Sequence, residues 1–355
     1  MSTTGSQWSA GHRRRALAGL AAVALALAGC ASGDADDDAG GATTTSSTAG
    51  AASTTTTDVG VTAEGATTDL VLDRSNDHGD RYADGILPVG DGKVVLDGPE
   101  QGFVYLCREG GEGGGADVRG PWFVNGDTEY DLNLKISVQG EVTWDGTYAV
   151  EVDGDVRRVT TNDVPDDHPT GQFPVDPDDP AYEYDRNPNT ISEQDLAYEL
   201  DATPEVADEP SCMGGESGVM NTGVALFNAL DAGNRDAGAW EVQDSCEGHP
   251  EVTGAYHYHT LSSCIDDVSV DTIIGWALDG FPITGPTVGE GNVLTTADLD
   301  ECHGITSTLD IDGEQVTTYH YVMTQDFPYS VSCFRGTPAE SPRLEGGAPA
   351  MPPGG

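Results

Sequence analysis

The pattern of hydrophobic and polar positions indicates short β-strands separated by turns. Residues 102–107 and 132–138 alternate with the period of two that a half-buried strand shows. Residues 142–150 contain two such stretches around an Asp-Gly pair, which predicts a hairpin. Residues 272–278 form a continuous apolar run, as a fully buried strand does. The chain is therefore expected to be mainly β.

Helical patterns are few. Residues 192–200, with Ser192 as the cap, predict one short helix, and residues 219–230 predict a further strand with a brief helical turn. Gly, Asp-Gly and Pro separate most of the apolar stretches. We expect a single disulfide-stabilised β-sandwich or distorted barrel with long loops, and the pattern does not choose between these two arrangements.

The first 29 residues have the pattern of an export signal. Arg13, Arg14 and Arg15 precede an apolar stretch, 16–28, that is too short to span a bilayer. It ends in Leu-Ala-Gly followed by Cys30, which resembles the lipobox of bacterial lipoproteins and implies that Cys30 is diacylated. We therefore expect an extracytoplasmic protein that is lipid-anchored to the cell membrane. The alternative is an ordinary cleavable signal peptide, residues 1–29, in which Cys30 has no role.

Composition divides the rest of the chain into three parts. Residues 30–68 consist almost entirely of Ala, Gly, Ser, Thr and Asp, and such a segment cannot bury enough apolar surface to fold. We expect a disordered linker there. Residues 338–355 are rich in Pro and Gly and predict a disordered tail. Residues 69–337 lie between them and fit the size of one β-rich domain.

The charge of the chain limits its partners. The formal net charge is −46, from 61 acidic and 15 basic residues. Such a chain repels phosphate backbones, which excludes nucleic-acid binding. Two explanations of the acidity stay open. One is solubility in a salty habitat, where ions screen the repulsion. The other is accumulation of calcium by carboxylates, which makes calcium a candidate structural ion.

Four of the cysteines belong to a half-repeat. Six of the seven cysteines remain when Cys30 is set aside, and an even number in an exported protein indicates disulfides. Residues 244–264 and 300–333 both read Asp-x-Cys-x-Gly, a loop, Tyr-His-Tyr and a closing Cys. We predict one bridge within each stretch and a third between the remaining two cysteines. The predicted pairs are Cys246 with Cys264, Cys302 with Cys333, and Cys107 with Cys212.

Histidines gather in the same region. In the tetrapeptide 256–259, Tyr-His-Tyr-His, a strand would place His257 and His259 on one face. Two imidazoles so placed can bind one metal ion, and His249 from the preceding loop and His320 from a neighbouring strand would complete the set. Three or four histidines without a thiolate indicate Zn²⁺ or Cu²⁺. Three histidines with an open position can also activate a water molecule.

Each of these residues has a structural alternative. The tyrosines and histidines can form a half-buried ladder whose polar atoms bond to the backbone. Asp279 follows a predicted buried strand, where it could be a ligand, the partner of a histidine or a general base. It could equally belong to an Asp-Gly turn. His303 lies beside a predicted disulfide and is expected at the surface.

Four motifs in order resemble the YHYH-domain proteins, a family named after this tetrapeptide. They are residues 185–189 (Asp-Arg-Asn-Pro-Asn), 254–259, 274–283 and 327–329. The resemblance covers roughly residues 122–336. It implies a secreted or surface domain in which His257 and His259 are important, and it supplies no reaction. The chain departs from the family pattern at Trp240, where that pattern has a histidine.

Two functions follow from these observations. The first is a metal-binding domain, with a metal-dependent hydrolase or a copper-handling enzyme as its catalytic forms. His257 and His259 would be the main ligands, His249 and His320 would add to them, and Asp279 would support them. The second is a non-catalytic surface module that binds a glycan or a protein partner. The pattern identifies neither a small-molecule substrate nor a surface partner.

Overall fold

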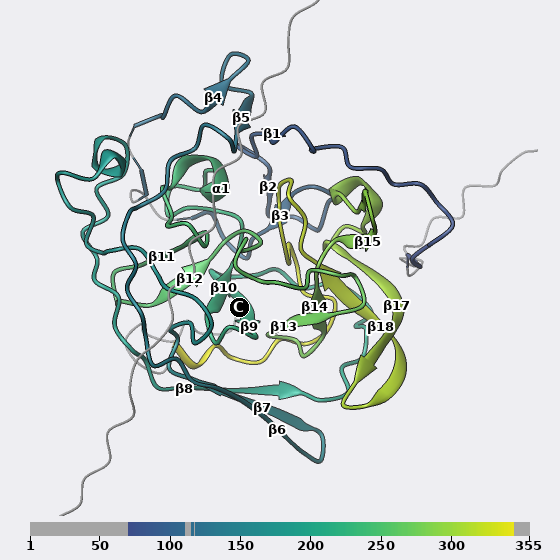
Figure 1. Cartoon of the computed structure of the whole chain (residues 1–355). Coiled ribbons are helices and arrows are strands. Elements are labelled where there is room, and N and C mark those ends of the chain that lie inside the picture. Colours follow the sequence, from purple (N-terminus) through teal and green to yellow (C-terminus); the bar gives the residue numbers. More distant parts are fainter. Residues whose placement is uncertain (1–69, 111–114, 117, 344–355) are drawn as a thin grey trace, which may run out of the picture. The chain divides into compact units, whose positions relative to one another are not determined.

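The computed structural model describes residues 70–343, apart from 111–114 and 117 (Figure 1). All of these belong to the second of two compact units, Gly65–Gly355. The predicted signal peptide 1–29, the predicted lipidation site Cys30, the predicted linker 30–68 and most of the predicted tail lie outside the described residues. Within the described part of the chain, none of the helices has the length and apolar character needed to cross a bilayer.

An eight-stranded mixed sheet is the centre of the fold (Figure 1). It pairs parallel strands at two places, β10 with β12 and β14 with β18, and the other neighbours are antiparallel. The sheet has edges at β11 and β17 and does not close on itself. In spatial order its strands are β11 (Gly248–Pro250), β12 (Tyr256–Tyr258), β10 (Ala225–Phe227), β9 (Glu216–Met220), β13 (Ile273–Ala277), β14 (Pro282–Thr284), β18 (Glu314–Val322) and β17 (Gly304–Ile311).

Smaller sheets and short helices surround it. The smaller sheets are β6 (Tyr148–Asp153), β7 (Val156–Thr161) and β8 (Leu196–Asp201); β1 (Ile86–Pro88), β5 (Glu129–Asp131) and β4 (Phe123–Val124); β2 (Val94–Val95) with β3 (Val104–Tyr105); and β15 (Thr287–Gly289) with β16 (Asn292–Val293). The helices are α1 (Ala237–Trp240) and the 3₁₀ turns η1 (Pro180–Glu183) and η2 (Thr296–Asp298). The prediction of a mainly β fold stabilised by disulfides is confirmed.

Tyrosine–carboxylate pairs are a recurring feature of the core. The phenol of Tyr256 donates to Asp244 at 2.8 Å, and that of Tyr321 donates to Asp279 at 2.6 Å. These four side chains are at most 3% exposed. A buried phenol needs a polar partner, and each carboxylate supplies one within the core.

The disulfides join Cys107 with Cys212, Cys246 with Cys264 and Cys302 with Cys333. This is the pairing predicted from the half-repeat. The second and third bridges each lie within one copy of the repeat. The first bridge spans a sequence separation of 105 and links the β2–β3 region to the chain that precedes β9.

Two strand predictions are confirmed, since β3 lies within 102–107 and β13 lies within 272–278. The predicted helix at 192–200 is wrong, because 196–201 form β8. Leu196, Tyr198 and Leu200 alternate into the core there and pair with β7. Tertiary pairing thus overrides a weak local preference for helix.

Two further predictions are wrong, and a third is confirmed for its strand only. Residues 132–137 form turns and loop instead of a strand, and only Val138 makes a β-bridge there. The hairpin around Asp145 does not form, because β6 begins at Tyr148 and pairs with β7 instead. Residues 219–230 contain the end of β9 and all of β10 but no helical turn.

Residues 338–343, which fall in the predicted tail, pack on the domain. The Arg343 guanidinium lies 2.6 Å from Asp163 and 3.0 Å from Glu216, and the Ser341 side chain is buried. Burial raises the pKa of Asp163 to about 7, and the contact with Arg343 opposes this rise. The ordered body of the chain therefore reaches at least Arg343.

Candidate metal centre

Two antiparallel strands at one edge of the large sheet place the first histidines. In the register of β11 and β12, His249 lies directly opposite His257. The preceding Gly248 allows this register, because a Cβ atom there would lie 2.1 Å from Cζ of Tyr256. His259 follows β12 by one residue. All three imidazoles are 3–4% exposed.

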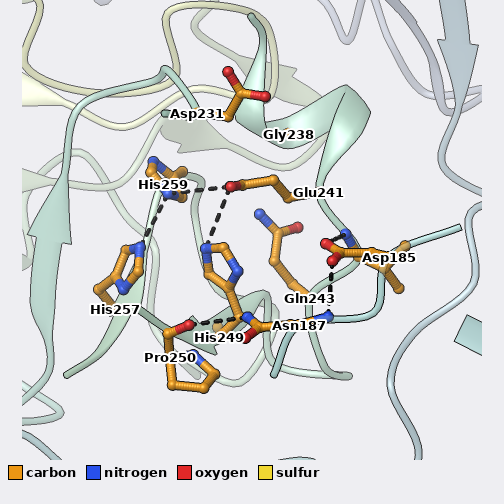
Figure 2. A network of polar contacts seen from close by, with 12 residues as sticks. Asp185, Asn187, Asp231, Gly238, Glu241, Gln243, His249, Pro250, His257 and His259 are labelled. Carbon is orange, nitrogen blue, oxygen red and sulfur yellow. Dashed lines mark hydrogen bonds and ion pairs between the residues drawn. The ribbon is translucent and has the colours of Figure 1, made fainter. Parts of the chain in front are cut away.

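The three imidazoles converge (Figure 2). Each offers one nitrogen, and the three nitrogens all lie within 4.8 Å of one another. The closest pair is Nε2 of His257 and Nε2 of His259, at 3.1 Å. The ring of Phe227 stacks on His257 with 4.2 Å between centroids, which fixes the plane of that imidazole. The structure therefore brings together three of the four predicted ligands.

Backbone carbonyls set which nitrogen faces the centre. Nδ1 of His257 lies 3.2 Å from the carbonyl oxygen of Ala255, and Nδ1 of His259 contacts that of Asn228. A carbonyl only accepts, so each Nδ1 carries the proton and donates it. Both Nε2 atoms then present lone pairs to each other. Only a cation between them, a proton or a metal ion, satisfies both.

Glu241 is a fourth member of the site that sequence reasoning missed. It directly follows α1, and its Oε2 lies 3.3 Å from Nε2 of His249 and 3.3 Å from Nε2 of His259. Neither the carboxylate Oε2 nor either ring nitrogen of His249 has a hydrogen-bond partner, although both side chains are buried. Such unpaired buried groups are rare, and here they indicate that these atoms bind a ligand.

Burial controls the protonation of the site. It lowers the pKa of His249 and His257 well below the ordinary value, and the neighbouring imidazoles add to this effect. Burial also lowers the pKa of His259 to about 4, opposed by the Asn228 carbonyl and Asp231. It raises the pKa of Glu241 well above the usual range, and nearby carboxylates raise it further. At neutral pH the rings are therefore neutral, the form that binds metals.

A cavity of about 900 Å³ gives access to the centre. Its walls include the three histidines, Glu241 and the loop 183–189, which contains the Asp-Arg-Asn-Pro-Asn motif. Asn187 of that loop donates to the carbonyl oxygen of Pro250 at 2.9 Å, beside His249 (Figure 2). This motif thus holds the strand that carries one ligand.

His320 does not join the centre, contrary to prediction. It lies on β18, and its Nδ1 and Nε2 contact the hydroxyls of Thr284 and Ser307 at 3.0 and 2.9 Å. Both ring nitrogens are therefore already used. The strand β18 is separated from β12 by β10, β9, β13 and β14, so the two strands are not neighbours.

Two other predicted positions have structural roles. The Asp279 carboxylate accepts hydrogen bonds from Tyr321 and from the backbone of Phe281 and Gly336. It contacts no histidine, so the turn interpretation describes it. His303 is buried, not at the surface, and its Nε2 lies 3.0 Å from the Thr324 hydroxyl.

Trp240, the departure from the family pattern, lies beside the site without entering it. Its Nε1 donates to the carboxylate of Asp91 at 3.0 Å. The next residue, Glu241, reaches the imidazoles. Among the described residues a second group, His168 with Cys246 and Cys264, has the spacing of a metal site. Its two cysteines form a disulfide and offer no thiolate.

Comparison with known proteins agrees with part of this picture. A family model described as YHYH protein matches residues 197–292. The match begins within β8, ends within β16 and contains His249, His257, His259 and Glu241. Neither the curated proteins nor the solved structures contain a match to the chain.

Proposed function

We propose that this chain, which belongs to the YHYH protein family, binds one transition-metal ion through His249, His257 and His259, with Glu241 as the fourth ligand. The observation that carries the proposal is the facing of the two Nε2 atoms of His257 and His259 at 3.1 Å, with both Nδ1 atoms turned to carbonyls. A metal ion between them makes use of both lone pairs.

The distances support a tetrahedral ion. With metal–nitrogen bonds of about 2.05 Å, two ligands of a tetrahedral Zn²⁺ ion lie roughly 3.3 Å apart. The separation of the His257 and His259 nitrogens is 3.1 Å, and those of Glu241 Oε2 from His249 and His259 are both 3.3 Å. The donor set of three imidazoles and one carboxylate fits Zn²⁺ and Cu²⁺, and the tetrahedral spacing favours Zn²⁺.

Glu241 gives the site its charge balance. A divalent ion would hold this carboxylate in its ionised form in spite of burial, because the ion replaces the lost hydration. Binding would therefore oppose the rise that burial causes in the pKa of Glu241 and would displace the proton that burial favours. The adjoining cavity of about 900 Å³ gives a small molecule access to the ion. If Glu241 moved away from the ion, a water molecule could take its place and the ion would lower the pKa of that water.

We also propose that the protein acts outside the cytoplasm, anchored to the membrane through lipidated Cys30. The support is the N-terminal pattern together with three disulfides, which form in oxidising compartments. Labelling of cells with a radioactive fatty acid should mark the wild-type protein, and Cys30→Ala should abolish the label. A wild-type protein without label would refute the anchor.

Metal analysis of purified protein tests the main proposal. Wild type should carry about one zinc or copper ion per chain, and His257→Ala with His259→Ala should carry less than about a tenth of that. His320→Ala is the matched control, since it removes a buried histidine outside the centre and should leave metal content unchanged. Circular dichroism and the absence of free thiols would show that each variant is folded.

The opposite result is equally clear. A folded wild-type protein that takes up no zinc or copper after chelation and reloading would refute the proposal. It would favour the alternative of a non-catalytic surface module. Equal metal loss in His320→Ala would also refute this ligand set.

A further inference from the structure

We infer that the eight-stranded sheet is an internal duplication in which the metal-binding position occurs twice, with its ligands present in the first copy and replaced in the second. The first copy comprises β9, β10, β11 and β12, within residues 216–259. The second comprises β13, β14, β17 and β18, within residues 273–322. The spatial order reads β11-β12-β10-β9 and then, in mirror order, β13-β14-β18-β17.

The register at the centre of the sheet has twofold symmetry. Val219 of β9 pairs with Trp276 of β13. On either side of this pair, Gly275 pairs with Met220 and Ala277 pairs with Gly218. A rotation that places each copy on the other converts each of these two pairs into the other pair. A local twofold axis therefore passes through the central pair.

The hairpins β9–β10 and β13–β14 match in detail. Each contains a register shift near its open end, next to Phe227 in the first and opposite Thr284 in the second. Each turn contains a glycine of positive φ, Gly223 at 85° and Gly280 at 87°. In both hairpins a backbone hydrogen bond closes the turn at equivalent positions. The N–H of Met220 donates to the carbonyl oxygen of Val224, and the N–H of Ala277 donates to that of Phe281. A shared bulge and a shared turn are difficult to obtain independently.

The Asp-x-Cys-x-Gly segments also superimpose in their bonding. The carboxylate of Asp244 accepts from the backbone of Cys246 and Gly248, and that of Asp300 accepts from the equivalent positions. The fourth residue has positive φ in both, 61° at Glu247 and 73° at His303. The same carboxylates accept the phenol of the first tyrosine in each Tyr-His-Tyr strand. His303 is therefore a turn residue in this duplicated segment.

The second copy replaces the ligands. Ile305 lies opposite His320 as His249 lies opposite His257. Val322 follows the Tyr-His-Tyr triplet where the first copy has His259. Both residues belong to a separate apolar cluster and are at most 3% exposed.

The partners of the remaining histidine differ as well. Thr284 occupies the place of Phe227, and its hydroxyl bonds to the one histidine that the second copy keeps, His320. Both nitrogens of that ring contact hydroxyl groups, whereas the equivalent ring in the first copy, His257, contacts the carbonyl oxygen of Ala255 and Nε2 of His259. The second copy thus keeps the strands and turns of the site, but apolar side chains and hydroxyl groups take the place of the metal ligands.

Rebuilding the ligands in the second copy tests the inference. The variant Ile305→His with Val322→His, made in the His257→Ala and His259→Ala background, should bind about one Zn²⁺ or Co²⁺ per chain. The background alone should bind less than about a tenth of an ion. Adding His320→Ala should abolish the restored binding. A folded rebuilt protein that binds no metal would overturn the equivalence of the two positions.

A second measurement does not depend on metal or on folding of the rebuilt variant. Tyr256→Phe and Tyr319→Phe remove the equivalent phenol–carboxylate bond from each copy. Both should lower the Tm, each by roughly 3–10 °C. A loss confined to one of the two would overturn the duplication. The metal assignment of the first copy rests on the proposed function, so a wild-type protein without metal together with equal Tm losses would refute that function alone.

Discussion

Replacement of Glu241 by glutamine should have opposite effects on the metal-free and the metal-bound protein. Glu241 is 6% exposed, and its Oε2 lies 3.3 Å from two imidazole nitrogens without a hydrogen bond. Glutamine has the same shape and no charge. Its amide N–H can donate to a neutral Nε2 atom at any pH, whereas the carboxyl group of Glu241 can donate only while it is protonated.

The magnitudes follow from burial and charge. A buried polar group without a partner costs about 1–3 kcal/mol. Metal-free Glu241→Gln should therefore gain about 1 kcal/mol of unfolding free energy, a rise in Tm of roughly 2–4 °C. The affinity for Zn²⁺ should fall by ~10- to 100-fold, or about 1.4–2.7 kcal/mol, because the ligand no longer neutralises the ion.

The effect on metal-free stability depends on pH. Burial raises the pKa of Glu241 well above its ordinary value, so the folded chain keeps a proton that the unfolded chain has already lost. The contribution of Glu241 to stability is therefore present at acid pH and is lost as the pH rises toward the folded pKa. The advantage of Glu241→Gln should be larger at pH 7 than at pH 5.

Calorimetric titration with Zn²⁺ and thermal unfolding in chelator at both pH values would measure these effects. Glu241→Asp is a suitable control, because it keeps the charge and shortens the side chain. Two results would refute the reasoning. One is unchanged zinc affinity in Glu241→Gln, and the other is a lower Tm of its metal-free form.

Three further predictions concern stability. In the Glu241→Gln background, the stability advantage of the metal-free protein over its His259→Gln variant should shrink by about 3 kcal/mol in urea melts as the pH falls from 6.5 to 4, because the unfolded chain protonates His259 first and the folded pKa is about 4; a difference that does not change with pH would contradict the burial of this ring. Tyr321→Phe removes the hydrogen bond to Asp279 and should cost about 1–3 kcal/mol while metal content stays the same. The double variant Cys107→Ser with Cys212→Ser removes a disulfide of sequence separation 105 and should lower the free energy of unfolding by about 4–5 kcal/mol, as measured by calorimetry. A loss below about 1 kcal/mol would refute this prediction.

Much of the site follows from short-range pattern. A period-two strand predicts that His257 and His259 face the same way, and the structure places them 3.1 Å apart. The cysteine pairs followed from the half-repeat because a bridge within each copy closes a short loop. The mainly β character followed from the spacing of apolar residues and turn residues.

The remaining features depend on strand order, which local pattern does not contain. His320 has the same neighbours in sequence as His257, but four strands separate β18 from β12 in the sheet. Glu241 carries no motif, and it enters the site only because α1 ends beside the imidazoles. Leu196 to Asp201 form a strand because β7 offers an unpaired edge.

By itself, the sequence determined that this protein is mainly β, how its cysteines pair, and that a Tyr-His-Tyr-His strand presents two imidazoles on one face. Those properties depend on residues that are close along the chain or repeated within it. The tertiary structure alone decided that the predicted ligand His249 joins the centre and the predicted ligand His320 does not, and that Glu241 completes it. The reason is physical: a metal position is a set of atoms a few ångströms apart, and long-range strand pairing decides which distant residues supply those atoms.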